Sequence, residues 1–306
     1  MPKVSVIIPN YNHSKYLVQR IESILDQTYQ DFEIIILDDC STDQSRSIIE
    51  GYRLNPKVTE IIYNEQNSGS TFKQWEKGIS IAHGELIWIA ESDDWCDPII
   101  LEELISGFDK DENCIFSYCQ SYCIQNVNTI SWQSQHPYLS EIVEGHVFIK
   151  NYMLKNNSVF NASMVLWKKE VYKSIPKDFT DYKFCGDWLF WIELARHGTI
   201  HISGKLLNYF RKHDQDVSGK ATKSGLNYKE ILTVLNRIYR DQLITDADYN
   251  NAFKYHLKAY WKDRNALEPL ISKQIEQLFK NPASQKTNYY KAVLSAIWYN
   301  RKDHDH

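Results

Sequence analysis

An apolar segment that ends in a cluster of acids constrains the fold of this chain more than any other feature. Residues 86–90 are typical of a buried strand, and Glu91, Asp93 and Asp94 follow directly. Carboxylates at the end of a buried strand are costly unless a cation or a ligand compensates their charge. Open α/β sheets bind ligands at the carboxyl ends of their strands. The segment is therefore either part of a ligand site or a solvated acidic turn before a helix.

Two further apolar runs favour the ligand site. Residues 33–37 end in Asp38 and Asp39, and residues 4–8 end in the polar segment 9–12. Three candidate strands thus end in ligand-capable groups early in the chain. Oxygen-rich acidic clusters suit Mg²⁺ or Mn²⁺, which proteins usually hold with one or two carboxylates plus substrate phosphates.

The order of strand-like and helix-like segments predicts an α/β fold. Their alternation favours βαβ units and a mostly parallel sheet flanked by helices. We expect strands over residues 4–8, 33–37, 60–63, 86–90, 114–124, 165–167, 200–202 and 206–211. We expect helices over residues 17–27, 44–55, 71–83, 98–109, 151–154 and 184–197, with Ser41 and Gln44 as a capping box, Gly84 closing the third helix and a loop over 125–135.

The last eighty residues differ in pattern. Residues 226–298 are helical and polar, which predicts a C-terminal helical appendage. We therefore divide the chain into an α/β domain of residues 1–225 and a helical region of residues 226–306. The first comprises two halves, 1–110 and 111–225.

Composition excludes several classes of protein. The net charge is −4 and no basic stripe stands out, which argues against a nucleic-acid partner. The six cysteines include no Cys-x-x-Cys pair, which argues against a zinc ribbon and a thioredoxin-like motif. Without a signal peptide, we expect free thiols in a reducing cytosol. No apolar run reaches the roughly 20 residues of a membrane span. We expect a cytoplasmic protein, and leave open whether it contacts the inner face of a membrane or forms a homo-oligomer.

Four motifs, in their order and spacing, resemble the family 2 glycosyltransferases, the large inverting group with the GT-A fold. They are VSVIIPNYN at 4–12, IIILDDCSTD at 34–43, NSGS at 67–70 and GELIWIAESDDW at 84–95. The resemblance implies a mostly parallel GT-A sheet, a nucleotide-diphosphate sugar donor of the UDP or dTDP type, and Mg²⁺ or Mn²⁺. It also implies sugar transfer to a hydroxyl of a saccharide or lipid-linked acceptor, in surface polysaccharide or glycan synthesis. On this resemblance, residues 1–225 are the catalytic domain, with a nucleotide-sugar half, 1–110, and an acceptor half, 111–225.

The same resemblance assigns the donor site. It implies that Asp39, with Asp38 beside it, contacts the nucleotide base, and that the loop of Pro9, Asn10 and Tyr11 packs against the base. The alternative for Asp38 and Asp39 is a purely structural role, in an Asx turn that starts the next helix.

The diphosphate and metal are assigned to the second acidic cluster. The resemblance implies that Asp93 or Asp94 binds the metal directly and that Glu91 helps through water. Lys73 lies near a helix N-terminus, where phosphate binds readily. The family shows an Arg-Asn pair near this position, so a solvated lysine stays an equal alternative.

Two later residues complete the expected site. Asp187, in Cys-Gly-Asp-Trp at 185–188, matches the position of the family's catalytic base, with a helix N-cap as its alternative. His213 follows an Arg-x-His pattern that implies contact with the metal or diphosphate, although a lone histidine is as often a surface or core residue.

Two other functions compete with this reading. A sugar nucleotidyltransferase also binds nucleotides on an α/β sheet, but it needs a glycine-rich loop after the first strand, where this chain has residues 10–13, Asn-Tyr-Asn-His. A non-catalytic nucleotide- or carbohydrate-binding protein of the same fold would not need all the acids at 39, 93, 94 and 187. Metal-dependent donor hydrolysis separates it from an enzyme.

Overall fold

The computed structural model describes residues 1–125, 129–212 and 224–302, and the chain divides into two compact units. The first unit consists of Met1–Gly145, Val159–Thr180 and Phe190–His213. The second combines His146–Ser158 and Asp181–Leu189 with the helices near the C-terminus. The second unit therefore takes two short segments from the middle of the sequence.

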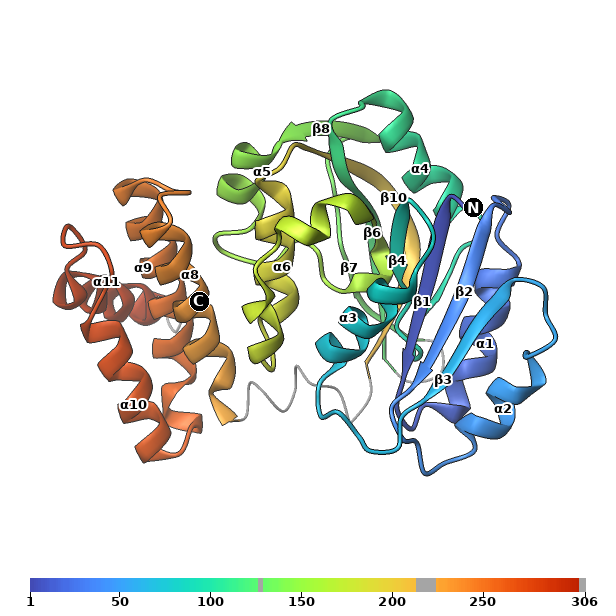
Figure 1. Cartoon of the computed structure of the whole chain (residues 1–306). Helices are drawn as coiled ribbons and strands as arrows, with labels where there is room; N and C mark the ends of the chain where they lie inside the picture. Colours follow the sequence, from blue (N-terminus) through green and yellow to red (C-terminus); the bar gives the residue numbers. More distant parts are fainter. Residues whose placement is uncertain (126–128, 213–223, 303–306) are drawn as a thin grey trace. The chain divides into compact units, whose positions relative to one another are not determined.

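The first unit begins with the alternating pattern that the sequence predicts. Its elements are β1 (Val4–Asn10), α1 (Ser14–Leu25), β2 (Phe32–Asp38), α2 (Ser45–Gly51), β3 (Val58–Tyr63), α3 (Thr71–Ile81) and β4 (Leu86–Ile89). Strands β3, β2, β1 and β4 pair in parallel. Helices α1 and α2 cover one face of these strands and α3 covers the other (Figure 1). Because both faces are covered, β1, β2 and β4 are buried at every position, which explains their continuous apolar runs.

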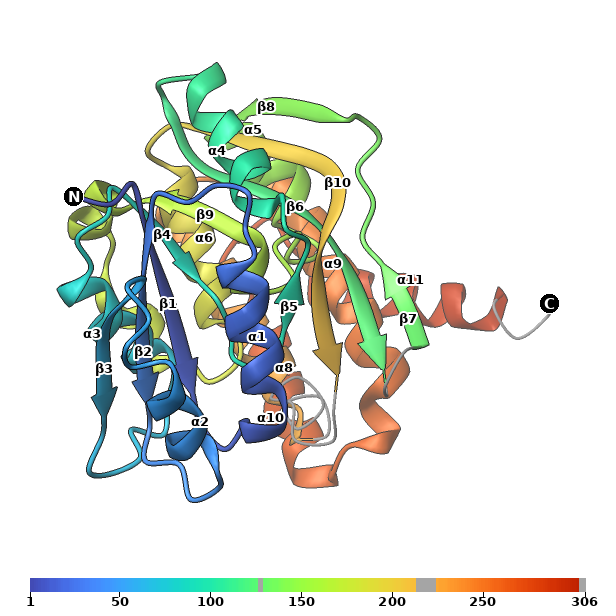
Figure 2. The same ribbon diagram turned by 90° about the vertical axis from the view of Figure 1, so that its right-hand side faces the viewer.

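The rest of the unit extends this sheet to ten strands. The elements that follow β4 in the chain are β5 (Trp95–Cys96), α4 (Ile100–Lys110), β6 (Cys114–Gln125), β7 (Thr129–Gln133), β8 (Ser140–Glu144), α5 (Gly145–Tyr152), η1 (Ala162–Met164), β9 (Val165–Lys168), η2 (Lys169–Ser174), η3 (Lys177–Asp181), α6 (Gly186–Ala195) and β10 (Thr199–Lys212). Of these, almost all of α5 and the first part of α6 belong to the second unit. The strand order is β3-β2-β1-β4-β9-β6-β10-β5, with β7 beside β6 and β8 beside β10 (Figure 2). Because β9 runs antiparallel to both of its neighbours, the sheet is mixed.

Several predicted details are wrong. The expected loop over 125–135 contains β7, which pairs with β6 and whose side chains are mostly exposed. The two strands expected over 200–202 and 206–211 form the single strand β10, which has register shifts. The expected capping box is absent, because α2 begins at Ser45 and the hydroxyl of Ser41 accepts hydrogen bonds from Asn10 and Asn12 instead.

Glycine allows α3 and the segment after it to lie close to β1. A Cβ at Gly78 would meet Ile7 at 2.5 Å, and one at Gly84 would meet the backbone nitrogen of Ser5 at 2.5 Å. Helix α3 ends at Ile81, so Gly84 does not cap it as expected. It permits close approach of two backbones.

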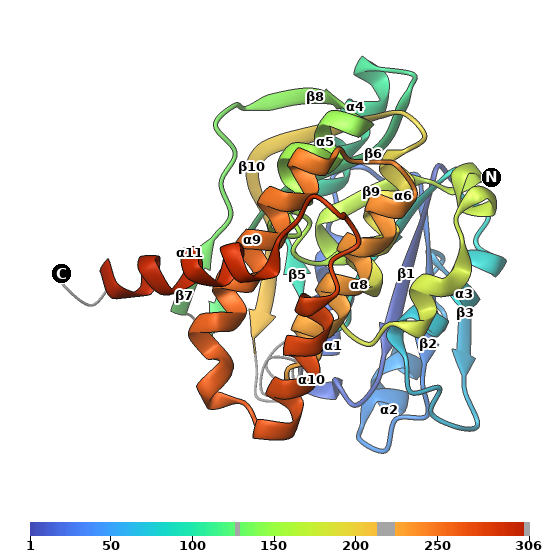
Figure 3. The same cartoon turned by 90° about the vertical axis from the view of Figure 1, so that its left-hand side faces the viewer.

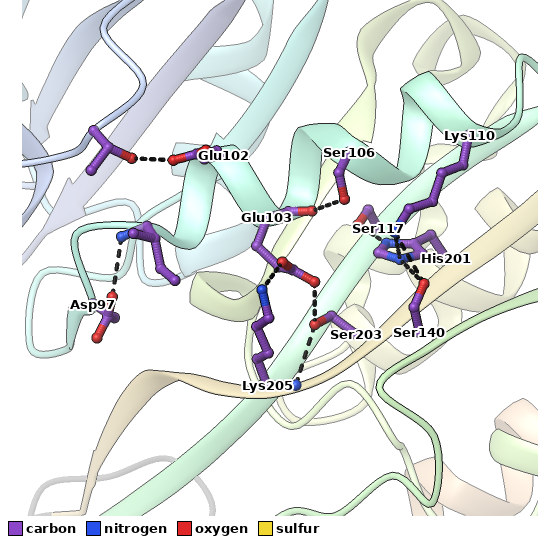
Figure 4. Close-up of polar contacts among 12 residues, drawn as sticks. Asp97, Glu102, Glu103, Ser106, Lys110, Ser117, Ser140, His201, Ser203 and Lys205 are labelled. Carbon is purple, nitrogen blue, oxygen red and sulfur yellow. Dashed lines mark hydrogen bonds and ion pairs between the residues drawn. The ribbon is translucent and has the colours of Figure 1, made fainter.

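A buried polar cluster joins α4 to strands β6, β8 and β10 (Figure 4). The ring nitrogens of His201 lie 2.7 Å from the hydroxyl of Ser117 and 2.9 Å from that of Ser140. Burial lowers the pKa of His201 to about 4, so the ring is neutral at neutral pH. Glu103 accepts hydrogen bonds from Ser203 and Lys205 in the same cluster. These partners satisfy each other, which favours a structural role.

The second unit contains the helices expected over 226–298. They are α8 (Leu226–Arg240), α9 (Asp246–Asp263), η4 (Arg264–Ala266), α10 (Pro269–Lys280) and α11 (Tyr289–Lys302) (Figure 3). Helix α9 begins with a capping box between Thr245 and Asp248. Aromatic contacts join the helices: Tyr249 of α9 contacts Tyr239 of α8, and Phe253 of α9 contacts Phe279 of α10. In the described ranges, no helix has the length and apolar character needed to cross a membrane.

Candidate active site

The ends of β1 and β2 form the first part of the site. The strands are parallel, with Asn10 beside Asp38, so their carboxyl ends lie at the same sheet edge. Asn10 donates to one oxygen of Asp38 at 2.8 Å, and the backbone nitrogen of Ser41 donates to the other at 3.0 Å. The carboxylate of Asp38 therefore fixes the loop that carries Asp39.

Neutral donors surround the carboxylate of Asp39. It accepts hydrogen bonds from Asn64 at 2.6 Å, from Gln74 at 3.0 Å, and from both the backbone nitrogen and the hydroxyl of Ser68 at 2.9 and 2.7 Å. Its side chain is only 4% exposed. Asn64 and Gln74 were not among the predicted site residues, because an amide side chain in a loop or on a helix carries no signal of its own.

Other predicted donor-site residues differ in exposure. Pro9 is buried, whereas Tyr11 is 46% exposed at the same sheet edge. Cys40 follows Asp39 with a φ of 63°, and its side chain is half-buried. Lys73 is exposed, with its amine 3.4 Å from the backbone oxygen of Ser68. His213 lies outside the described residues.

The loop after β4 forms the second part of the site. Strand β4 is parallel to β1, so this loop lies at the same edge as Asp39. Asp94 is 1% exposed and accepts from the amide of Asn161 at 2.6 Å, the hydroxyl of Ser163 at 2.7 Å and the backbone nitrogen of Arg211 at 3.0 Å. Segments about seventy and about 117 residues further along the chain thus hold this carboxylate.

Negative charge at this strand end is under-compensated. Burial, followed by the negative charge of Asp93, raises the pKa values of Glu91 and Asp94 well above their usual range. Trp75 donates to one oxygen of Glu91 at 3.0 Å, which offsets part of this cost. Acids whose pKa values rise for these reasons favour a nearby cation.

Two arginines supply part of the missing positive charge. Arg20 is fully buried on α1, donates to the backbone oxygen of Glu91 at 2.9 Å, and has two further guanidinium nitrogens without a hydrogen-bond partner in the described part of the chain. Arg211 donates to the backbone oxygen of Asp93 at 2.6 Å. Its guanidinium carbon lies 4.2 Å from the ring centre of Tyr16 and 4.5 Å from that of Trp95. Neither arginine was among the predicted site residues.

The acids at this strand end fit a metal held jointly with a ligand. Across residues 1–125, 129–212 and 224–302, no three His, Cys, Asp or Glu side chains gather closely enough to hold a metal ion. Glu91, Asp93 and Asp94 are therefore not a ready-made cage. Their chemistry suits Mg²⁺ or Mn²⁺ bound by one or two carboxylates, with phosphate oxygens completing the coordination.

Asp187 belongs to the second unit and lies inside the first turn of α6. Its two oxygens accept from the backbone nitrogen of Trp188 at 2.7 Å and from the amide of Asn157 at 3.2 Å. Burial is the main cause that raises the pKa of Asp187, to about 7. A carboxylate that titrates near neutral pH is suited to accept a proton.

Comparison with known proteins agrees with this arrangement. The profile of a family described as "Glycosyl transferase family 2" matches residues 5–175. The chain is 38% identical over 120 residues to glycosyltransferase GlyG of Streptococcus pneumoniae, a match that covers 39% of this chain and 40% of GlyG. It is 37% identical over 114 residues to TarS of Staphylococcus aureus, a poly(ribitol-phosphate) β-N-acetylglucosaminyltransferase, with 36% and 19% coverage. The chain thus matches less than half the length of either relative.

Solved structures show the same fold. TarS residues 1–349, in complex with UDP-GlcNAc, superpose with a TM-score of 0.67 at 21% identity over 90% of this chain and 79% of that one. The mannosyltransferase PcManGT of Pyrobaculum calidifontis, in complex with GDP-Man and Mn²⁺, has a TM-score of 0.56 at 14% identity, with 97% and 80% coverage. The predicted GT-A fold, a central sheet flanked by helices, is confirmed.

The fold, with acids at the two strand ends beside β1, is that of the GT-A class. The family profile matches more than half of the chain and contains both acidic strand ends. The chain belongs to glycosyl transferase family 2, as the sequence motifs predicted.

Proposed function

We propose that this chain is an inverting glycosyltransferase that moves a sugar from a nucleotide-diphosphate donor to an acceptor hydroxyl. The observation that carries the proposal is the pair of acidic strand ends, Asp38–Asp39 and Glu91–Asp94, on either side of β1 at one sheet edge. The first presents a carboxylate set among neutral donors, and the second presents charge that calls for a cation.

Asp39 is assigned to the nucleotide base. Asn64, Ser68 and Gln74 hold its carboxylate in one orientation, which reduces the ordering that a nucleotide would otherwise impose. Tyr11 is the exposed aromatic side chain that flanks the base, and Pro9 and Asn10 shape the loop behind it.

The diphosphate is assigned to the loop after β4. Asp93 or Asp94 would bind Mg²⁺ or Mn²⁺ directly, with Glu91 acting through water. When bound, the metal supplies positive charge that stabilises the departing nucleoside diphosphate. Lys73 and His213 are assigned contacts with the donor phosphates. The three acids and their protein donors hold the loop in shape for such a ligand.

Asp187 is assigned the role of base. Inverting transfer breaks the bond between the anomeric carbon and the diphosphate while the acceptor oxygen attacks from the opposite face. The acceptor hydroxyl proton passes to the carboxylate of Asp187, which Asn157 and the backbone of Trp188 hold in place. The pKa near 7 means that a substantial fraction of this group is deprotonated and able to act at neutral pH.

Donor and acceptor follow from the relatives. A UDP or dTDP sugar is the proposed donor, consistent with UDP-GlcNAc in the TarS structure. A saccharide or lipid-linked acceptor in surface polysaccharide or glycan synthesis is consistent with the poly(ribitol-phosphate) named for TarS. Work at the inner face of a membrane, or as a homo-oligomer, belongs to the same proposal.

Donor binding is tested first, with two independent readouts. Thermal shifts are recorded with UDP, dTDP and GDP, each with and without Mn²⁺, because a ligand of the native state raises the melting temperature. Alkylation of Cys40 provides the second readout, since the other five cysteines are buried and Cys40 adjoins Asp39. A bound nucleotide should slow alkylation. If no nucleotide protects Cys40 or shifts the melting temperature, the donor site is misassigned.

Replacement of Asp187 by asparagine tests the catalytic assignment. Asp187→Asn keeps the side-chain shape but cannot accept a proton, so release of UDP from a UDP-sugar should fall by about 10² to 10⁴ while nucleotide affinity is unchanged. In the wild-type protein the rate should rise with pH through about 7, because the base must be deprotonated. Wild-type activity in a folded Asp187→Asn protein would remove this residue from the mechanism. Nucleotide binding without any turnover in the wild-type protein would favour the non-catalytic alternative.

A further inference from the structure

The C-terminal helices hold the loop that carries Asp187. Glu230, on α8, accepts hydrogen bonds from three consecutive backbone nitrogens: Lys183 at 3.0 Å, Phe184 at 2.8 Å and Cys185 at 2.8 Å. Helix α6 begins at the next residue and Asp187 follows. One carboxylate from the tail thus fixes the backbone immediately before the assigned base.

Helix α9 holds the other partner of the base. His256 lies 2.8 Å from the backbone oxygen of Leu154, and the hydroxyl of Tyr255 donates to Asn156 at 3.1 Å. Because a carbonyl oxygen only accepts, His256 carries its proton on Nε2. These two bonds secure the segment that ends in Asn157, which donates to Asp187. Asp187 accepts hydrogen bonds from the amide of Asn157 and the backbone nitrogen of Trp188. Both donors therefore lie in segments that side chains of the C-terminal helices hold.

Apolar packing joins the same three segments. Trp188, next to the base, lines a small pocket together with Leu154, His256, Ile231 and Leu235. Its indole nitrogen also donates to the backbone oxygen of Met153 at 2.8 Å. The start of α6 is thus held through its backbone, its aromatic side chain and its hydrogen-bond partner.

We propose that Glu230 is a positioning residue for Asp187, and that the C-terminal helices set the orientation of the catalytic base. This inference rests on the proposed role of Asp187. It gives the helical tail a part in catalysis although it contains none of the assigned reacting groups.

A cap of purely structural value would not require this particular residue. A glutamate that accepts three backbone N–H groups stabilises the loop strongly, because these are charge-assisted hydrogen bonds. Its negative charge also acts on Asp187 and adds to the effect of burial in raising the pKa of that base. The thiol of Cys185 is a second titratable group that interacts with Asp187, whereas its hydrogen-bond donor Asn157 is neutral. Glu230 therefore couples loop geometry to proton affinity.

Glu230→Gln is the central test, made in the full-length protein. Glutamine has nearly the same shape, loses the charge and offers one acceptor oxygen in place of two. We expect turnover of UDP-N-acetylglucosamine or dTDP-glucose, whichever binds in the nucleotide panel, to fall by about 10- to 10²-fold. The acidic limb of the pH–rate profile should move to lower pH, since removal of a negative neighbour favours the ionised base. Nucleotide affinity should stay within twofold of wild type.

Hydrogen–deuterium exchange measures the loop without relying on activity. Peptides that contain residues 183–185 should exchange faster in Glu230→Gln than in wild type. Glu276→Gln is the matched control, because Glu276 is also a tail carboxylate but bonds Tyr289 and Lys280 instead. The control should leave turnover, the pH profile and exchange at 183–185 unchanged.

The outcomes separate this inference from the proposed function. Faster exchange, lower turnover and a shifted pH limb, all with intact nucleotide binding, support the positioning role. A folded Glu230→Gln protein with wild-type turnover and pH profile overturns it, even if Asp187→Asn is inactive. An active Asp187→Asn protein overturns the assignment of the base instead. If Glu230→Gln does not fold, Glu230→Asp keeps the charge on a shorter side chain, and wild-type turnover with unchanged exchange in that variant overturns the positioning role.

Discussion

The two acidic strand ends on either side of β1 are stabilised in different ways. At Asp39, neutral donors from a single neighbouring stretch, residues 64–74, bind the carboxylate. At Asp94, the donors come from residues 161–163 and 211, and a buried arginine lies beneath the loop. The donors to Asp39 thus come from one stretch of the chain, whereas those to Asp94 come from two stretches that are far apart in the sequence.

This difference indicates different ligands. A carboxylate whose hydrogen bonds are locally satisfied can present a fixed acceptor to an N–H group of a base without a counter-ion. A cluster of acids with raised pKa values gains from a cation, and a metal bridging to phosphate oxygens provides one. The comparison therefore predicts that metal dependence resides at the second strand end alone.

The largest expected effect is on metal-dependent binding at the second strand end. Asp94→Asn removes one negative charge, so Mn²⁺-dependent UDP affinity should fall by about 10²-fold, which is about 2.7 kcal/mol. The loss of unfolding free energy should be smaller, about 1–2 kcal/mol, since asparagine keeps one acceptor oxygen. Calorimetric titration with and without a chelator measures the first quantity, and urea unfolding measures the second.

Asp97→Asn is the control for this change. Asp97 is a nearby acid that directly follows β5 and accepts from the backbone nitrogen of Ile99. It should retain wild-type metal dependence. If neither the chelator nor Asp94→Asn changes UDP affinity, the two strand ends do not differ in metal dependence and the comparison is wrong.

A smaller effect is expected from Arg20→Met, which removes the buried cation beneath the second strand end. We expect the free energy of unfolding to fall by about 2 kcal/mol in the absence of metal, because the acids lose their internal counter-charge. Mn²⁺ with UDP should then raise the melting temperature more than it does in wild type, since the metal supplies the missing charge. Arg46→Met, which removes an exposed arginine beside Tyr63, should change stability by less than about 0.5 kcal/mol. An equal ligand shift in Arg20→Met and wild type would contradict the counter-charge role.

The smallest effect is expected at the first strand end. Asp39→Asn should weaken UDP binding about tenfold, or about 1.4 kcal/mol, because the charged acceptor for the base is lost. The loss should be the same with Mn²⁺ and with chelator. Asp43→Asn, in which a loop acid bonded to backbone nitrogens of Ser14 and Ser45 is changed, should leave affinity unaltered. A metal-dependent loss in Asp39→Asn would show that the two ends act as one site.

The sequence predicted those parts of the fold that pack on both faces. Strands β1, β2 and β4 are continuous apolar runs because helices cover them, so their ends, and therefore Asp39 and Asp94, could be located. Strand β7 was missed because its side chains are mostly exposed and polar. In β10, Ser203-Gly204-Lys205 interrupts the apolar pattern although the strand continues.

The residues that form hydrogen bonds with the site were harder to predict from the sequence than the acids themselves. Asn161, Ser163 and Glu230 lie far along the chain from the residues they hold, and no local pattern links them. Arg20 did carry a signal. It shares the buried face of α1 with Leu17, Ile21 and Ile24, and a charged residue within an apolar helical stripe indicates a buried counter-charge.

The second unit consists of three separate segments of the sequence, which limits how this chain can be recombined with its relatives. Because residues 146–158 and 181–189 belong to the same unit as helices α8 to α11, these helices do not form a part that can be exchanged alone. A chimaera that exchanges only the residues after 225 would pair foreign helices with the native loops around Trp188 and Leu154. Exchange of the second unit between family members would therefore require all three segments with their matched contacts.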